Sequence, residues 1–88
     1  QYMIKEQIKE LKTQLAELEK LEKDIASAEA LTAELEAKLV AASESADGAA
    51  ITAIAKDMDD NKKKIDEFYE RWEEKSAELE AAKDKYPI

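Results

Sequence analysis

Apolar residues recur along the first half of the chain at alternating steps of four and three, the spacing of a coiled-coil seam. This first stripe consists of Ile4, Ile8, Leu11, Leu15, Leu18, Leu21, Ile25, Ala28, Thr32, Leu35 and Leu39. Two consecutive steps of three around Leu18–Leu21 should overwind the supercoil locally. The stripe predicts one long helix over about residues 3–42.

The second half carries a more regular stripe. Its members are Ile51, Met58, Ile65, Trp72, Leu79 and Tyr86 at intervals of seven, with Ile54, Asn61, Phe68, Lys75 and Ala82 between them. The pattern predicts a second helix over about residues 49–85, because Pro87 cannot continue a helix. Between the stripes lie serines, an aspartate and the single glycine, Gly48, so a turn is predicted at about residues 43–48, with Asp47 or Ser45 capping the second helix.

The two stripes have similar lengths, and a fold-back at this turn brings them together. Facing residues then have numbers that add to about 90, so that Leu18 meets Trp72 and Ile25 meets Ile65. The predicted fold class is therefore all-α, a two-helix antiparallel coiled-coil hairpin. We expect a single domain that is monomeric.

Two seam positions of the second helix are polar. Asn61 should lie opposite Ala28, and Lys75 opposite Leu15. Such residues either fix the alignment of the helices, with the Lys75 ammonium reaching water, or weaken the seam so that the hairpin flexes. The sequence leaves both interpretations open.

Composition supports long helices and limits the partners. Of 88 residues, 41% are charged and the net charge is −8, which disfavours anionic membranes and non-specific binding to nucleic acid. The chain has no cysteine and no apolar run long enough to span a membrane, so we expect a cytoplasmic protein. Because it begins with Gln1, we expect a fragment of a larger protein.

The sequence offers little chemistry. It has no histidine and no cysteine, and a two-helix hairpin provides no cleft that would shift the pKa of the paired acids Asp59-Asp60 or Glu73-Glu74. We therefore expect no enzyme activity, cofactor, metal or small-molecule substrate in this segment.

The only basic run is Lys62-Lys63-Lys64, flanked by acidic residues. Successive helix residues point in different directions, so these lysines either join neighbouring lysines such as Lys56 to contact phosphates or form a solvated face neutralised by nearby acids. Downstream, Phe68 and Trp72 belong to the seam. Tyr69 and Arg71 flank it, and either form a recognition patch or shield the tryptophan.

The run Ile65–Glu80 resembles the C-terminal coiled-coil domain of Uup-type ABC-F ATPases, which closes with a Tyr-x-Arg-Trp-Glu-Glu-Leu-like sequence. Tyr69, Arg71 and Trp72 carry this motif, while Lys75 stands where the family has leucine. The resemblance implies a cytoplasmic parent protein with two ATP-binding domains upstream. It also implies a module that contacts DNA or ribosomal RNA.

If phosphates are bound, the candidate residues are Lys62, Lys63, Lys64 and Arg71, with Lys56 as a weaker member. The alternative is a structural or protein-binding hairpin with no nucleic-acid role. The regular seam and the acidic surface support that alternative.

Overall fold

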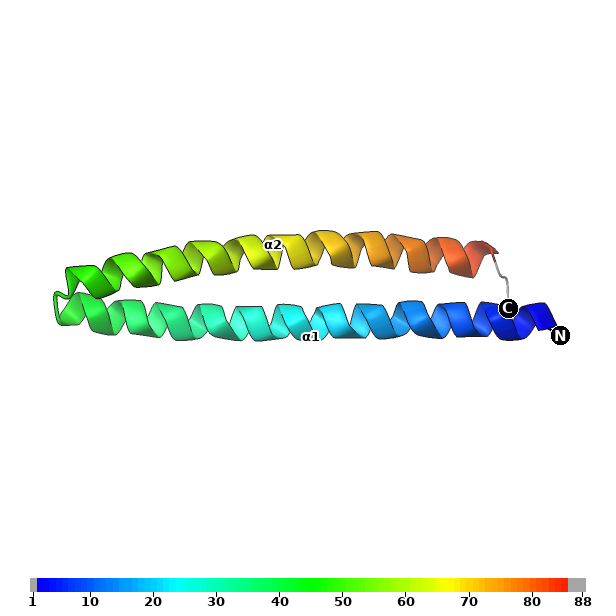
Figure 1. Ribbon diagram of the computed structural model, residues 1–88, viewed down its shortest axis with the longest axis horizontal. Coiled ribbons are helices and arrows are strands. Elements are labelled where there is room, and N and C mark those ends of the chain that lie inside the picture. Colours follow the sequence, from blue (N-terminus) through cyan, green and yellow to red (C-terminus); the bar gives the residue numbers. More distant parts are fainter. Residues whose placement is uncertain (1, 86–88) are drawn as a thin grey trace.

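The computed structural model describes the backbone of residues 2–85 and the side chains of residues 5–84. This part of the chain contains two α-helices and no strand: α1, Tyr2–Glu44, and α2, Gly48–Lys85. α2 runs back along α1, so the start of α1 and the end of α2 lie at the same end of the rod (Figure 1). The rod measures 67 × 14 × 14 Å. The predicted all-α fold, a two-helix antiparallel hairpin, is confirmed.

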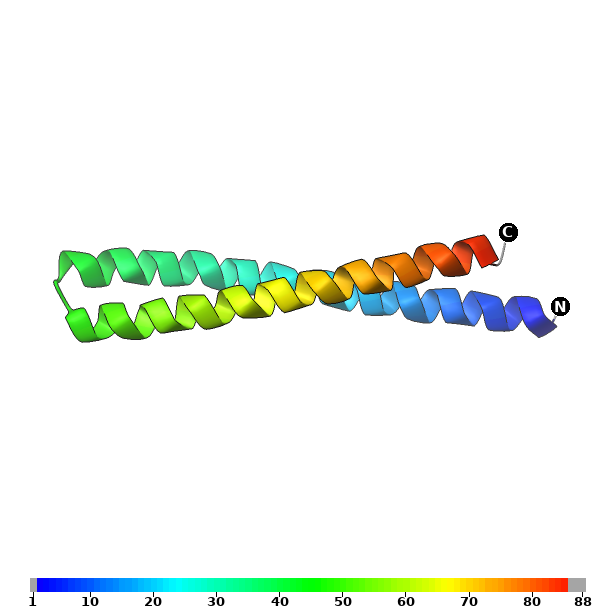
Figure 2. The same cartoon turned by 90° about the horizontal axis from the view of Figure 1, so that it is seen from above.

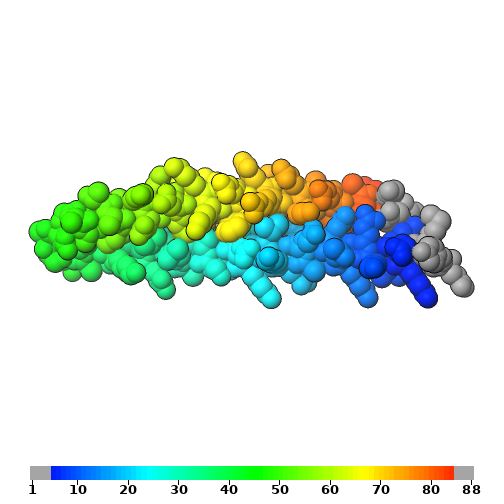
Figure 3. Space-filling model, viewed as in Figure 1, coloured from blue at the N-terminus to red at the C-terminus, as the bar shows by residue number. Residues whose placement is uncertain are grey.

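The two helices wind around each other. Seen from above, α2 crosses α1 near the middle of the rod (Figure 2), and in the space-filling view their side chains meet along its length (Figure 3). A seven-residue apolar repeat on helices of about 3.6 residues per turn requires this supercoil, because it keeps the seam between the helices.

α1 ends in a Schellman motif. Ala46 adopts the left-handed backbone conformation, with φ of 53°. The amide of Ala46 donates to the Ser43 carbonyl at 3.2 Å, and the amide of Asp47 donates to the Ala42 carbonyl at 3.0 Å. These are the two hydrogen bonds of the motif, and they satisfy carbonyl groups that a helix end otherwise leaves unpaired.

Asp47 is the N-cap of α2. Its Oδ1 accepts a hydrogen bond from the Ala50 amide at 3.1 Å, while Ser45 instead donates its hydroxyl to carbonyls at the end of α1. The turn is thus shorter than the predicted 43–48. The prediction that Gly48 belongs to the turn is wrong. Gly48 is the first residue of α2 and has no positive φ, and the chain reverses at Ala46 instead.

The seam of α2 follows the predicted stripe. Asn61, Leu79 and Ala82 are buried. The other described members are half-buried: Ile51, Ile54, Met58, Ile65, Phe68, Trp72 and Lys75. Tyr86, the last predicted member, lies outside the described residues. The core is thin, since even Leu35, the most buried apolar side chain described, keeps 5% of its surface exposed.

The beginning of α1 does not use the predicted stripe. Ile8 and Leu15 are 41% and 45% exposed, whereas Gln7 and Gln14 are half-buried. The positions that are buried or half-buried at regular steps of four and three are Gln7, Leu11, Gln14, Leu18, Leu21, Ile25, Ala28, Thr32, Leu35, Leu39 and Ala42. The side chain of Ile4 lies outside the described residues.

This regular spacing explains the difference. α1 is one uninterrupted helix, and its longer apolar stretch from Leu18 to Ala42 fixes which side faces α2. From Gln7 to Leu18 the residues continue the same face, so between residues 7 and 42 no pair of consecutive three-residue steps occurs. Gln7 and Gln14 consequently take the seam positions expected for Ile8 and Leu15.

Asn61 aligns the two helices near the middle of the rod. Its side chain is 4% exposed, and its Nδ2 donates at 2.8 Å to both the Ala28 carbonyl and Thr32 Oγ1. The predicted Asn61–Ala28 pairing is confirmed. The predicted position of Lys75 opposite Leu15 is wrong, because Leu15 is exposed and Lys75 reaches Glu17 instead.

Candidate functional site

The motif region of α2 is held against α1 by three polar contacts. The Tyr69 hydroxyl donates to Glu29 Oε1 at 2.6 Å, and Trp72 Nε1 donates to Glu22 Oε1 at 3.3 Å. Lys75 Nζ lies 2.9 Å from Glu17 Oε2. We call Tyr69, Trp72 and Lys75 the clasp, because each binds a different carboxylate of α1.

The clasp residues face α1 because of their positions on α2. Trp72 and Lys75 belong to the seam, and Tyr69 immediately follows the seam residue Phe68. Their acceptors lie beside the seam of α1, so carboxylates that elsewhere face water are within reach of the α2 side chains. The motif therefore joins the two helices.

Two members of the clasp have shifted pKa values. The hydrogen bond to Glu29 raises the pKa of Tyr69, since ionisation would place a phenolate beside a carboxylate. The contact with Glu17, assisted by the charge of Glu78, raises the pKa of Lys75. Both contacts favour the protonated side chain.

Tyr69 lies beside Trp72. The sequence left open whether Tyr69 shields this tryptophan or forms a recognition patch with Arg71. A shallow hollow of about 200 Å³ is lined by Tyr69, Trp72, Glu22 and Ile25. Tyr69 keeps 45% of its surface exposed, but its hydroxyl is bound to Glu29. The arrangement favours the shielding interpretation.

The basic residues predicted to contact phosphates do not form one patch. Lys62 lies on the flank of α2 that also carries Tyr69, seven residues later. Lys64 lies on the opposite flank. Lys63 points to the outer face, where its Nζ is 3.2 Å from Asp59 Oδ2. Three successive residues thus present their charges in three directions.

The remaining two candidates, Lys56 and Arg71, each lie one heptad away from a lysine of this run. Lys56 shares the outer face with Lys63, and Arg71 shares a flank with Lys64. Arg71 borders a hollow whose lining also includes Glu17, Asp24 and Glu74. Lys64 and Arg71 are the two candidates that lie together on one flank, and the hollow beside Arg71 is lined by both acidic and basic side chains.

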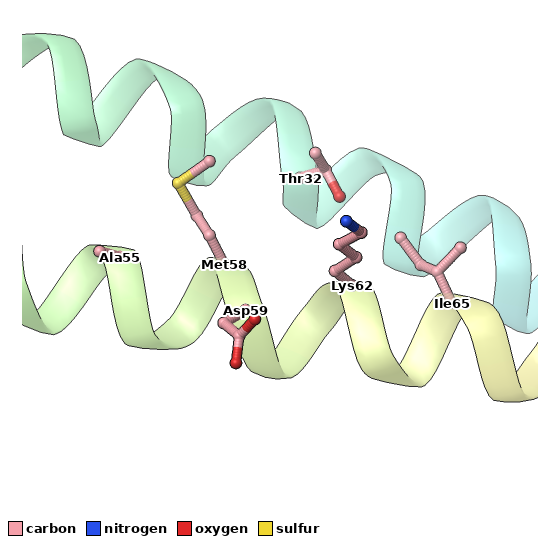
Figure 4. Close-up of a pocket in the computed structure, with 6 residues that line it drawn as sticks. All are labelled: Thr32, Ala55, Met58, Asp59, Lys62 and Ile65. Carbon is pink, nitrogen blue, oxygen red and sulfur yellow. The ribbon is translucent and has the colours of Figure 1, made fainter.

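A further hollow lies under Lys62 (Figure 4). Its volume is about 480 Å³, and it is lined by Thr32, Ala55, Met58, Asp59, Lys62 and Ile65. Figure 4 shows Met58 and Lys62 extending from α2 toward α1, with Thr32 on the facing helix. The small side chain of Ala55 leaves this flank open, a signal that the sequence analysis did not use.

The described residues show no group of three or more potential metal ligands. Within the described residues, neither helix contains an apolar stretch of the length that a membrane span requires.

The fold and the clasp define an antiparallel coiled-coil hairpin module whose aromatic motif binds the facing helix. The chain belongs to the ABC transporter C-terminal domain family, whose model matches residues 9–77 and thus both helices and the turn. This assignment agrees with the family level of the resemblance seen in the Tyr69–Glu74 run. No curated protein and no solved structure matches the chain significantly.

Sequence reasoning missed the carboxylates that hold the clasp. Glu17, Glu22 and Glu29 are ordinary members of an acidic helix by composition. The available signal was their regular spacing beside the seam, since Glu22 and Glu29 are seven residues apart. Assigning them to Trp72 and Tyr69 also required the correct register between the helices.

Proposed function

We propose that this chain is the non-catalytic C-terminal module of a cytoplasmic ABC-F-type ATPase of the Uup kind, and that it contacts nucleic acid. The observation that carries the proposal is the Tyr69–Glu74 motif within a chain of the ABC transporter C-terminal domain family. The ATP-binding domains would belong to the preceding part of the parent protein. The hairpin would act as a narrow arm that reaches a DNA or ribosomal RNA surface.

The proposed contacts are made by individual side chains on both flanks of α2 and do not depend on one basic patch. The chain has a net charge of −8, so general attraction to phosphates is unfavourable. Among the described residues, Lys62, Lys64 and Arg71 form no ion pair within 4.0 Å, unlike Lys63, which is bound to Asp59. We assign the phosphate contacts to these three side chains, with Lys63 and Lys56 at the margin.

The test is fluorescence anisotropy with a labelled RNA hairpin and a labelled four-way DNA junction at low salt. Replacing Lys62, Lys64 and Arg71 by glutamine should abolish most of the binding. Each lost phosphate contact should also reduce the slope of log K against log salt by about 0.7 to 0.9.

The matched control replaces Lys9, Lys23 and Lys38 by glutamine, because these α1 lysines are exposed, lie away from the Arg71 hollow, and give the same charge change. An equal loss of nucleic-acid binding in both triple variants would show that only net charge matters, and it would contradict the assignment of the phosphate contacts to Lys62, Lys64 and Arg71. Absence of binding by the unaltered chain at high micromolar concentration would defeat the nucleic-acid function itself.

A protein-contacting arm is the second candidate. It is favoured by the acidic surface and by the mainly apolar hollow beneath Lys62, which suits an inserted side chain better than a phosphate. Ala55→Leu would fill this hollow on the exposed flank of α2. Under this candidate the substitution should weaken protein binding and leave nucleic-acid binding unchanged.

A further inference from the structure

An apolar stripe on α1 flanks the seam and stays partly exposed. Ile8 and Leu15 are 41% and 45% exposed and lie seven residues apart on one side of the helix. They adjoin the seam residues Leu11 and Leu18, whereas the seam positions beside them are Gln7 and Gln14, so the apolar stripe of this segment is offset from the seam. An apolar stripe offset in this way leaves part of its surface for a second neighbouring helix.

The seam position next to the exposed Leu15 is occupied by a polar residue, Gln14. Gln14 is half-buried beside Leu15, and its Oε1 is buried without a hydrogen-bond partner. A solitary hairpin would be more stable with the leucine inside and the glutamine outside, because an unpaired buried acceptor and an exposed leucine are both unfavourable. The arrangement therefore suits a further helix that covers Ile8 and Leu15.

The charges beside the stripe indicate which helix fits. The residues that border it on the outer side of α1 change sign along the helix: Lys5 and Lys12 are basic, whereas Glu19 is acidic. A second α1 running in the opposite direction would place Ile8 on Leu15 and Lys5 near Glu19 of the second copy. Two such ion pairs would form around a twofold axis, whereas the two Lys12 side chains lie close to the axis and repel each other, which contributes to the weakness of the contact.

We propose that this chain self-associates through Ile8 and Leu15 into an antiparallel dimer of hairpins. The contact joins the open ends of the two rods, and the turns point away from each other. This interface is independent of the proposed nucleic-acid contact, whose residues lie on α2. It departs from the monomer expected from the sequence.

The dimer should be weak. Two exposed apolar side chains per copy bury much less than the ~800 Å² per partner of a stable complex, so a dissociation constant on the order of 0.1 mM is expected. Sedimentation velocity and light scattering from about 10 µM to 1 mM should show the shift from monomer to dimer. A species that stays monomeric at 1 mM overturns the proposal.

Leu15→Glu should reduce association at least tenfold while circular dichroism stays helical, because residue 15 lies outside the seam. The matched control is Val40→Glu, since Val40 is 58% exposed on the same helix but far from the stripe. Equal loss of association in both variants overturns the assignment of the surface.

The direction of the second copy is tested separately. Lys5→Glu and Glu19→Lys should each weaken association about threefold to tenfold, and the double variant should restore it. Because the chain has no cysteine, Lys12→Cys gives a single thiol that should cross-link two copies readily under oxidation, whereas Lys38→Cys should not. Absence of restoration together with equal cross-linking at both positions overturns the antiparallel arrangement.

Discussion

Asn61 occupies a seam position where an unpaired amide would be costly. Its Nδ2 donates to both the Ala28 carbonyl and Thr32 Oγ1, and Thr32 Oγ1 in turn donates to Ala28 at 3.2 Å. Sliding one helix by a turn would remove these partners. Asn61 therefore fixes the alignment of the helices. Lys75 is held at the edge of the seam by Glu17 and Glu78.

The Tyr69–Glu29 hydrogen bond should make stability depend on alkaline pH. The pKa of Tyr69 is raised in the folded chain, so its contribution is complete below the unfolded value of about 10 and is lost as pH rises through the higher folded value. The Lys75 pKa is also raised, and the sign is the same. Tyr69→Phe removes only the tyrosine contribution.

Thermal unfolding at pH 8 and pH 11, followed by circular dichroism, checks this dependence. The melting temperature of the unaltered chain should fall more between these pH values than that of Tyr69→Phe. Lys75→Gln should likewise show a smaller fall. An identical fall in all three proteins would show that neither contact is linked to folding.

At the scale of elements, the turn puts an alanine in left-handed backbone and a glycine in helical backbone, which is the opposite of what each residue prefers. Ala46 has φ of 53°, a conformation that costs an L-residue about 1 kcal/mol and glycine very little. Gly48 lies in helical backbone, and a Cβ built there meets nothing within 4 Å. Ala46→Gly should therefore increase the free energy of unfolding by about 1 kcal/mol, and Gly48→Ala by about 0.5 to 1 kcal/mol.

Urea denaturation of each variant measures these gains. Ala53→Gly provides the control, because residue 53 is an exposed interior position of α2 and glycine there should lower stability by about 0.5 to 1 kcal/mol. A loss of stability in Ala46→Gly would contradict the left-handed assignment of the turn.

The second helix could be predicted almost completely from the sequence, while the beginning of the first could not. In α2, bulky apolar residues repeat every seven positions, so a single face qualifies as the seam. In α1, Gln7 adjoins Ile8 and Gln14 adjoins Leu15, and residue hydrophobicity favours the second member of each pair. The continuity of the helix beyond Leu18 decides otherwise.

The turn and the clasp show two further reasons why parts of the structure could not be predicted from the sequence. A glycine suggests a reversal, yet the hydrogen bonds of a Schellman motif support the reversal at Ala46 instead. The partners of Tyr69 and Trp72 depend on the register between the helices. Asn61 faces Ala28 as predicted, but the long side chains of Tyr69 and Trp72 reach carboxylates that lie further along α1 than the residues expected opposite them, so side-chain acceptors cannot be assigned from spacing alone.

At the scale of the whole molecule, the seam differs between the two halves of the rod. The half near the turn contains buried Ile25, Ala28, Leu35 and Ala42 and the hydrogen-bonded Asn61. The seam of the open half contains buried Leu18, Leu79 and Ala82, but it also includes Gln7, Gln14 and Lys75. Polar side chains in the seam and an unpaired acceptor should make local opening easier there.

Amide hydrogen exchange should therefore be faster at residues 7–18 and 75–82 than at residues 25–42 and 51–65, by at least about tenfold.

Gln14→Leu removes the buried unpaired Oε1 and adds an apolar side chain to the seam, so it should raise the free energy of unfolding by about 1 to 2 kcal/mol and slow exchange in the open half. Ala16→Leu is the control, because residue 16 is exposed and away from the seam. Uniform exchange along the rod, unchanged by Gln14→Leu, would show that the polar seam residues do not weaken the open end.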